Sequence, residues 1–598
     1  MTLQRQIAAI VICVLVGPQP GFGADLSPNK WKPEDKARAE QAEMVPWPSQ
    51  ARVVEGQSGL VAATMSPIAV HAGVEALRQG GTAADGAATV ALTQITTALG
   101  SYVSYAGILQ LVYYDAASGK VSSLNAGWDS YLGETDPKTI PVSDLGSLPF
   151  ARQPTAGAEG RKTLVPGFMA GIEAMHKRFG HLPFATLFQP AIAYAEGGIA
   201  VSPLLANYFS VYGKFLARTP EGKAFVQQAG SAAPKMGDRF IQPELAKTLR
   251  AVAQNGASYM YTGAWGQQYV QAVQRDGGRA TMEDMKRYNP VWEEPQSTTF
   301  LGHTVYAPGK SNNSATGVLE ALNLAEATQL DRIGPYHKDG KAFQTLSNIL
   351  RVVAYDGAPD PQLIEWKRKN RLSSEPADRL TKNYAKALAP VLNEVGNEGE
   401  HEGHHHSDAV VVIDRWGNVA ALVHSINTVP WGTTGIVVGG IPISDAAGFQ
   451  QSLMSAFKPG DMVPQDESPV IAMNGSKPDL AVATIGVSLL PETVRLLVSV
   501  LSNHLDPLTV MAAPPLLLNL EPLRTGEGNF TKPYLVPEGV YDPEFLQQLR
   551  ESGIIIKQKS TIEVYGIKGT AVLGVIDQQS GVLRGAETPR VFGFADAY

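Results

Sequence analysis

Apolar residues recur along the chain with two spacings, one typical of helices and one typical of strands. Residues 67–79 have helical spacing and end at a Gly-Gly pair, and the Ala-rich residues 82–92 predict a second helix. Residues 108–114 (ILQLVYY) predict a strand, and residues 165–290 predict mainly helices separated by Gly. This alternation of strands and helices predicts a layered α/β protein.

The clearest strand pattern is the β-branched run at residues 409–413 (AVVVI), which is typical of a buried strand. A turn signal at residues 414–418 (DRWGN) and a second apolar run at residues 419–426 follow it, so a β-hairpin is predicted. Later runs predict strands at residues 479–484, 553–557 and 570–577, and a helix at residues 491–504.

A polar segment rich in His, Glu and Gly precedes this hairpin. It contains His401, Glu402 and His405, which match the zinc-protease string H-E-x-x-H. That string binds zinc on a helix, where the two His lie one turn apart. Three Gly interrupt the segment and no apolar residue gives it a buried face, so a helix and a zinc-protease site are disfavoured. Metal binding by the His cluster at residues 401–406 stays open as an alternative.

Composition and charge narrow the classes of function. The chain has 598 residues, of which 44% are hydrophobic, so a large core is expected. The net charge is −7, and Lys and Arg are scattered without a basic stripe, which argues against a nucleic-acid partner. Residues 25–50 are polar and contain Pro, and they predict an extended arm.

The N-terminus resembles a secretory signal. Arg5 precedes a ten-residue apolar run at residues 7–16, and small residues near position 24 suit cleavage, so residues 1–24 are predicted to be a signal peptide and the protein periplasmic or secreted. An uncleaved anchor is the alternative. The only Cys, Cys13, lies in this run, so a mature chain would have neither disulfides nor a thiol nucleophile. No later apolar run approaches 18 residues, so no membrane contact is expected after cleavage.

Ser407 stands at the junction of the polar segment and the predicted buried strand. If the bond between His406 and Ser407 is cut, Ser407 becomes an N-terminal residue whose hydroxyl is a nucleophile and whose own α-amine is the base. An α-amine has a pKa of about 7.7–8, which suits a general base at neutral pH. Such chemistry needs no cofactor. The structural alternative is an ordinary hydroxyl at a strand end.

Segments in chain order resemble the γ-glutamyltransferase (gamma-glutamyltranspeptidase) family of N-terminal-nucleophile hydrolases. Residues 407–414 (SDAVVVID), 416–419 (WGNV) and 425–428 (SINT) are similar to the family's T-T-H-x-S-V-V-D, D-G-N-A-V and T-x-N-T-x-F-G. Residues 72–85 (AGVEALRQGGTAAD) and the V-P-G and Q-P-A signatures at 165–167 and 189–191 also fit. The resemblance covers about residues 55–598.

The resemblance implies a four-layer αββα sandwich and a precursor that cuts itself into two subunits which stay together. The large subunit is expected at residues 25–406 and the small subunit at residues 407–598, as a heterodimer. Ser407 takes the position of the nucleophile, which is usually Thr, and Ser425 that of the hydroxyl residue that hydrogen-bonds the nucleophile. Asn427 matches an Asn of the substrate pocket.

The chain departs from the family where the γ-glutamyl group binds. The resemblance places Gly127 where the family has an Arg for the α-carboxylate, and Gly448 where it has an acid for the α-amine. An α-carboxylate without its Arg loses a strong, orienting contact. The family's S-S-M-[ST]-P reads QDESP at residues 465–469, with Ser468 at the hydroxyl position.

The two oxyanion-hole glycines of the family fall near Val487 and Ser488, after Gly486. Backbone N–H groups stabilise an oxyanion, so side chains at these positions are tolerable. Four residues are candidates to line a remodelled pocket, although each also fits a core or surface role: Asp445, Asp466, Trp128 and Trp431.

The leading hypothesis is therefore an exported, self-cleaving amidase or acyltransferase that acts on a small-molecule or peptide amide. Within it, γ-glutamyl chemistry on glutathione-like peptides competes with an acylase for another amide, and the missing Arg and acid favour altered specificity. A second hypothesis is a non-catalytic binding protein with the same fold. A third is a His-rich metal-binding protein of the periplasm. Self-cleavage discriminates the first hypothesis from the second, and metal dependence identifies the third.

Overall fold

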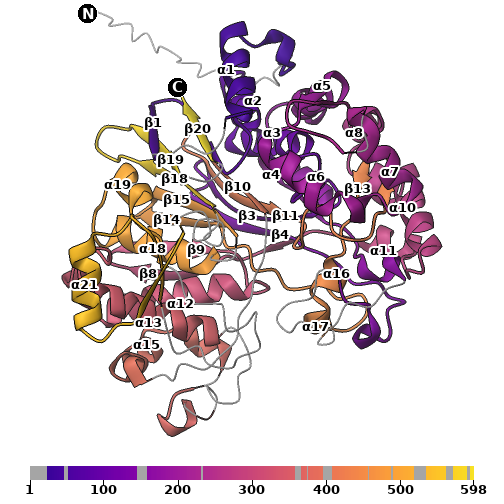
Figure 1. Cartoon of the computed structure of the whole chain (residues 1–598). Helices are drawn as coiled ribbons and strands as arrows, with labels where there is room; N and C mark the ends of the chain where they lie inside the picture. Colours follow the sequence, from indigo (N-terminus) through magenta and orange to yellow (C-terminus); the bar gives the residue numbers. More distant parts are fainter. Residues whose placement is uncertain are drawn as a thin grey trace, which may run out of the picture.

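The computed structural model describes residues 23–45, 51–144, 158–230, 233–356, 365, 367–373, 375–394, 407–454, 457–486, 489–516, 534–560, 570–588 and 593–598. Two seven-stranded sheets lie face to face in the middle of the molecule, and helices cover their outer faces (Figure 1). The layers follow the order α, β, β, α, which confirms the α/β sandwich that the family resemblance implied.

One sheet, which we name the Ser407 sheet, contains the hairpin predicted from the sequence. Every residue of the two hairpin strands is buried, as their unbroken apolar runs predict. All neighbours in this sheet pair antiparallel. The strand order is β20 (Phe594–Ala597), β2 (Leu60–Ala63), β10 (Ser407–Ile413), β11 (Val419–Ser425), β3 (Ile108–Asp115), β4 (Lys120–Ala126) and β7 (Val291–Glu293).

The second sheet, which we name the Gly486 sheet, is also antiparallel throughout. Its central strand β15 ends directly before Gly486. The strand order is β1 (Arg52–Gly56), β19 (Leu583–Glu587), β18 (Thr570–Ile576), β15 (Lys477–Ile485), β14 (Val470–Asn474), β9 (His303–Ala307) and β8 (Gln296–Phe300).

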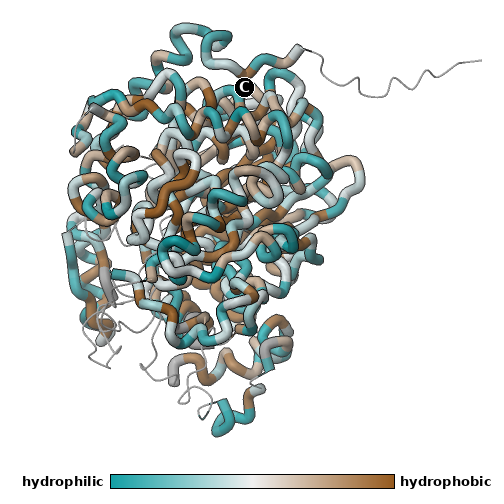
Figure 2. The backbone as a smooth tube through the Cα atoms, turned by 90° about the vertical axis from the view of Figure 1, so that its right-hand side faces the viewer, coloured by the Kyte–Doolittle hydropathy of each residue, from teal (hydrophilic) through white to brown (hydrophobic). Residues whose placement is uncertain are grey.

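The two sheets pack through alternate residues of their strands, since successive side chains of a strand point to opposite faces. Val411 and Ile413 of β10 belong to the buried cluster between the sheets, whereas Val410 and Val412 belong to the cluster beneath the helices. Gly574 of β18 permits a close approach, because a Cβ there would lie 3.0 Å from Ile413 Cδ1 and 3.1 Å from Val411 Cγ1. Figure 2 shows the hydrophobic stretches concentrated towards the middle of the molecule.

Helices α2 (Pro67–Arg78) and α3 (Ala83–Thr97) cover the outer face of the Ser407 sheet and confirm the two predicted helices. Helix α3 ends at Thr97 and so continues beyond the predicted end at residue 92. Every residue of α3 is buried. The outer face of the Gly486 sheet is covered by α12 (Asn313–Ala327), α13 (Gly340–Asp356) and α18 (Leu489–Leu501), the last being the helix predicted at 491–504.

Residues 165–290 contain mainly helices, as predicted. These helices are α4 (Phe168–Phe179), α5 (Gln189–Gly197), α6 (Pro203–Leu216), α7 (Pro220–Val226), α8 (Pro243–Asn255), α9 (Ser258–Tyr261), α10 (Ala264–Arg275) and α11 (Met282–Arg287). Further helices are α15 (Lys382–Leu388), α16 (Ala446–Phe449), α17 (Gln451–Met454), α19 (Pro507–Ala512) and α21 (Pro543–Glu551). Short strand pairs are β5 (Ile199–Ala200) with β6 (Arg239–Phe240), β12 (Val437–Val438) with β13 (Ile441–Pro442), and β16 (Tyr534–Pro537) with β17 (Ile556–Lys559).

Two local predictions were wrong. The strand expected at residues 553–557 begins only at Ile556, because a helix and its C-terminal turn occupy the preceding residues. The arm at residues 25–50 contains helix α1 (Pro33–Glu43) and is not extended in that part. Pro33 at the first helical turn and two acidic residues behind it favour a helix start, and Trp31 is buried edge-on against His71.

Among the described residues, no helix combines the length and the apolarity needed to cross a membrane. The predicted signal peptide lies almost wholly outside the described part of the chain.

The buried ion pair of helix α18 is expected to matter for stability. Arg495 Nη2 lies 2.6 Å from Glu492 Oε1, and both side chains are almost fully buried. Arg495→Met should lower the free energy of unfolding by about 3–5 kcal/mol, because it leaves the Glu492 charge without its cation. Urea unfolding followed by Trp fluorescence measures this loss. The exposed pair of Arg584 with Glu55 is the control, for which Arg584→Met should change stability by less than about 1 kcal/mol.

Candidate active site

Ser407 is the first residue of β10 and lies opposite Ser425 in the register of the hairpin. Both residues are buried, and the Ser407 hydroxyl donates a hydrogen bond of 2.8 Å to Ser425 Oγ. The backbone N–H of Asn427 donates to the same oxygen at 2.9 Å. The structure therefore brings together the predicted nucleophile, its predicted hydroxyl partner and the predicted pocket residue.

The other face of this strand pair carries Asp408 and His424, which sequence analysis did not single out. His424 Nε2 lies 3.0 Å from Gln94 Oε1 of α3, and burial lowers the pKa of His424 to about 3. Burial also raises the pKa of Asp408, more than its hydrogen bond from Thr64 lowers it. Since His424 is a weak base on the face opposite Ser425, it is poorly placed to deprotonate Ser407.

Gly486 lies at the same end of the molecule as Ser407. The Tyr114 hydroxyl donates a 3.0 Å hydrogen bond to the Ser476 carbonyl, so β15 begins beside the far end of the hairpin and ends at Gly486 near its Ser407 end. Gly486 has a φ of 98°, a conformation that favours glycine. The predicted oxyanion residues Val487 and Ser488 lie outside the described residues.

A group of buried amide side chains fills the space beside Gly127, where the family resemblance places an Arg. A Cβ at Gly127 would lie 2.9 Å from Gln465 Nε2 and 3.0 Å from Asn125 Oδ1. Gln465 Oε1 accepts a 3.0 Å hydrogen bond from Asn427 Nδ2, which links this group to the nucleophile. Trp128, which was a candidate for the pocket, is buried with its indole N–H unpartnered among the described residues.

Gly448 and Asp445 lie on a neighbouring buried segment. A Cβ at Gly448 would lie 2.9 Å from the Pro141 carbonyl oxygen and 3.0 Å from Lys162 Cγ, so an acidic side chain has no room there. Asp445 accepts hydrogen bonds from three hydroxyl groups at 2.5–2.7 Å, those of Ser143, Thr428 and Thr433. These bonds give Asp445 a structural role, and contact with a substrate stays a prediction.

The remaining candidate residues are Ser468, Asp466 and Trp431. Ser468 is buried and donates to the Asp466 carbonyl at 3.0 Å, and Asp466 itself is exposed. Trp431 lies in the core, where its ring packs on Phe209 and its N–H donates to the Leu99 carbonyl. The structure therefore supports Trp431 as a core residue and not as part of a pocket beside Ser407.

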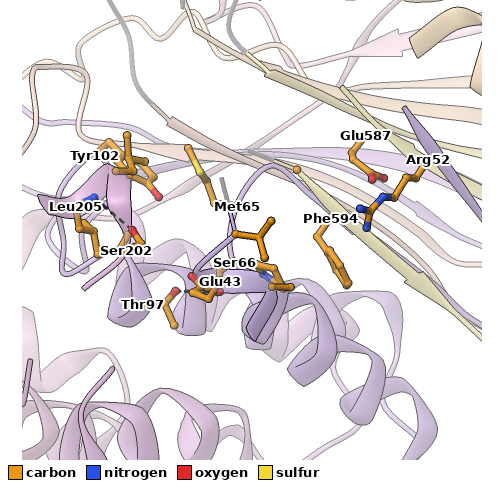
Figure 3. A pocket seen from close by; sticks show the side chains of 16 residues that line it. Glu43, Arg52, Met65, Ser66, Thr97, Tyr102, Ser202, Leu205, Glu587 and Phe594 are labelled. Atoms are coloured by element: carbon orange, nitrogen blue, oxygen red, sulfur yellow. Dashed lines mark hydrogen bonds between the residues drawn. The ribbon is translucent and has the colours of Figure 1, made fainter. Parts of the chain in front are cut away.

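A cavity of about 140 Å³ (Figure 3) has Glu43 and Tyr102 in its lining, and both lie close enough to Asp408 for their charges to interact. Glu43, Ser66 and Tyr102 line it, and Glu43 Oε2 accepts a 3.2 Å hydrogen bond from Ser66 Oγ. The pKa of Tyr102 is raised by burial and by the charge of Asp408. None of the residues that line this cavity belongs to the Ser407 group, so it is distinct from the expected acyl pocket.

The described residues contain no cluster of His, Cys, Asp or Glu suited to a metal ion. The His-rich segment at residues 395–406 lies outside the described residues. The H-E-x-x-H match at His401, Glu402 and His405 falls in this segment.

The contact between Gly127 and Gln465 makes a testable prediction. Gly127→Ala should destabilise the protein by about 1–3 kcal/mol, because the added methyl meets a buried amide that must move. Gln465→Ala removes that amide, so in the double variant the cost of the methyl should largely disappear. Chemical denaturation of the four proteins measures the coupling. Strictly additive effects would contradict the contact.

The comparisons with known proteins agree with this geometry. The family model described as Gamma-glutamyltranspeptidase matches residues 69–593. A glutathione hydrolase-like proenzyme of Bacillus subtilis (strain 168) is 26% identical over 445 residues, which are 72% of this chain and 80% of the relative. An acylase proenzyme of Pseudomonas sp. (strain V22) is 27% identical over 387 residues, which are 62% of this chain and 66% of the relative.

Solved structures show the same fold. The cephalosporin acylase from Bacillus halodurans superposes with a TM-score of 0.75 at 22% identity and covers 93% of this chain and 98% of its own. Because the family match spans most of the sequence and the sheets have the expected order of layers, the chain belongs to the gamma-glutamyltranspeptidase family.

Proposed function

We propose that this chain is a self-cleaving amidohydrolase and acyltransferase whose nucleophile is Ser407. The observation that carries the proposal is the hydrogen bond from Ser407 Oγ to Ser425 Oγ at the start of a fully buried strand. A nucleophile must be held in one orientation, and a rigid strand between two sheets does this. The names of the relatives, which include proenzymes of glutathione hydrolases and acylases, support this class of reaction.

Self-cleavage begins when Ser407 Oγ attacks the carbonyl carbon of His406. The C–N bond of the peptide breaks, the hydroxyl proton moves to the released α-amine, and an ester remains on Ser407. Water then hydrolyses the ester and frees the carboxylate of His406. The result is a large chain that ends at His406 and a small chain that begins with Ser407.

In turnover the new α-amine takes the hydroxyl proton while Ser407 Oγ attacks the amide carbonyl of the substrate. The same proton passes to the leaving amine, and the acyl group stays on Ser407 as an ester. Water or a second amine then takes the acyl group and restores Ser407. The backbone N–H groups of Val487 and Ser488 are the proposed donors to the oxyanion. No cofactor takes part in these steps.

Altered specificity is the version of this function that the pocket favours. Gln465 occupies the space over Gly127, where the family resemblance expects an Arg, and Gly127 itself offers no cation. Glutathione and other γ-glutamyl compounds carry an α-carboxylate that needs such a partner. Hence the proposed substrate is an amide with a different acyl group, and glutathione hydrolysis is the second candidate.

The cellular setting is part of the proposal. We place the mature enzyme in the periplasm or outside the cell, because residues 1–24 have the features of a signal peptide. A non-catalytic binding protein has no need for self-cleavage, and a metal-binding protein loses its function with a chelator. An enzyme that works through Ser407 keeps its activity in EDTA.

Replacing the nucleophile tests the proposal directly. Ser407→Ala should stay a single chain and hydrolyse no amide, because it lacks the attacking oxygen. Ser407→Thr is the control, since it keeps the hydroxyl and should still cleave. Intact mass under denaturing conditions and N-terminal sequencing of each fragment measure the outcome. An unmodified chain that remains whole, or one cut at another bond, would exclude Ser407 as the N-terminal nucleophile.

Ser425→Ala tests the positioning of the nucleophile. The variant should fold and cleave itself, but self-cleavage and kcat should fall roughly tenfold, because one orienting hydrogen bond is lost. Ser425→Thr restores a hydroxyl and should recover most of the rate. A Ser425→Ala variant with unchanged rates would show that the hydrogen bond has no part in the reaction.

A further inference from the structure

The buried polar side chains next to the nucleophile point to the kind of acyl group that the enzyme accepts. We propose that Ser407 takes an acyl group whose far end carries a positively charged amine, held by Glu467 with help from Asp466. This inference rests on the proposed function, because it assigns the substrate class of the same Ser407 site.

Glu467 is connected to the nucleophile through two residues. Ser407 bonds to Ser425, the Asn427 N–H bonds to Ser425, and the Asn427 side chain lies in hydrogen-bonding range of Glu467. Glu467 is only 3% exposed, and its neighbour Gln465 accepts a hydrogen bond from the same Asn427 side chain. Glu467 therefore lies one side chain away from the residues that hold the nucleophile.

Two oxygens in this group are buried without a hydrogen-bond partner among the described residues. They are Glu467 Oε2 and Asn427 Oδ1. Buried acceptors are normally satisfied, and an ammonium group offers three donors and a compensating charge. A carboxylate offers acceptors only, so it would leave both oxygens without a donor. The unfilled acceptors thus match an amine and not an acid.

The charges of the surrounding side chains favour the same ligand. Gly127 supplies no cation. In the described part of the chain, no Lys or Arg bonds to the side chains of this group, which are Asn125, Gln465, Asn427 and Glu467. Asp466 adds a second carboxyl close to Glu467: burial raises the pKa of Glu467, and the charge of Asp466 raises it further. Burial raises the pKa of Glu467 to about 7, and a nearby ammonium would favour its ionised form.

The main alternative is a structural role for Glu467. A protonated Glu467 can donate a hydrogen bond to Asn427 Oδ1 and satisfy both groups without any ligand. A Gln side chain of the same shape can donate the same bond through its NH₂ group. Glu467→Gln therefore preserves a structural role but removes the negative charge, so this variant separates the two explanations.

Four p-nitroanilides with a shared leaving group test the proposal: 4-aminobutyryl (amine only), γ-glutamyl (amine and carboxylate), butyryl (neither) and glutaryl (carboxylate only). The self-cleaved enzyme should show the highest kcat/KM on the 4-aminobutyryl compound, at least about tenfold above butyryl, with glutaryl the slowest. The amine-bearing compounds can release p-nitroaniline by spontaneous ring closure, so the rate measured with the Ser407→Ala protein is subtracted. Glu467→Gln should remove the preference for the amine, so that the ratio of kcat/KM between the 4-aminobutyryl and butyryl compounds falls to about one.

Glu587→Gln is the matched control. Glu587 is also 3% exposed, burial also raises its pKa to about 7, and its Oε2 is also unpartnered among the described residues, but it lines the separate cavity near Asp408. This variant should keep the order of the four substrates. A change of the order in Glu587→Gln as large as in Glu467→Gln would show that any buried carboxyl has this effect and would overturn the assignment.

The outcomes separate this inference from the function on which it rests. A chain that does not cleave itself overturns the proposed function. A self-cleaved enzyme that prefers the butyryl or glutaryl compound, or does not turn over the 4-aminobutyryl compound, overturns only the inference. An amine preference that survives in Glu467→Gln also overturns it, because the preference would then have another source.

Discussion

The candidate site depends on the register of one β-hairpin. Ser407 and Ser425 face each other because β10 and β11 pair residue for residue from Ile413 with Val419 back to the strand ends. A slip of one residue would turn Ser407 to the helical face and bring Asp408 between the sheets. The burial of every residue in both strands prevents such a slip, since it would exchange apolar and polar side chains in two clusters at once.

The same alternation explains why polar residues lie deep in the molecule. Asp408 and His424 face the helices, where Thr64 and Gln94 supply hydrogen bonds. The hydroxyls of the site face the space between the sheets, at the end where Gly486 lies. The helices thus bury one set of polar groups, and the two sheets bury the other set, which includes the proposed nucleophile. Burial without full satisfaction is common at functional sites, and Asn427, with a positive φ of 49°, combines it with backbone strain.

Local patterns predicted most of the elements that position the site, and contacts distant in sequence could not be predicted in that way. The hairpin followed from two apolar runs around a Gly-Asn turn, and its short turn fixed the Ser407–Ser425 pair. In contrast, Gln465 and Gly127 are 338 residues apart in sequence, and only the fold shows that the amide occupies the space over the glycine. Helix α1 escaped prediction because its sequence is polar and lacks an apolar stripe, so its place depends on Trp31 and on contacts with α2. Asp445 bonds to two hydroxyls of one nearby loop, Thr428 and Thr433, and to Ser143, which is 302 residues away in sequence and which no spacing rule connects to it.

Both sheets interleave strands from the two sides of the His406–Ser407 bond. In the Ser407 sheet β10 lies between β2 and β11, and in the Gly486 sheet β9 pairs with β14 and β1 with β19. A cut at this bond therefore leaves two chains whose separation would expose the strands of both sheets, and the large buried surface holds them together. The side chains next to Ser407 follow the same logic, because Gly127 and Asn125 come from one side of the bond and Gln465, Asn427 and Glu467 from the other. The specificity that we propose therefore depends on the contact between the two halves, where a larger side chain on one side needs room on the facing side.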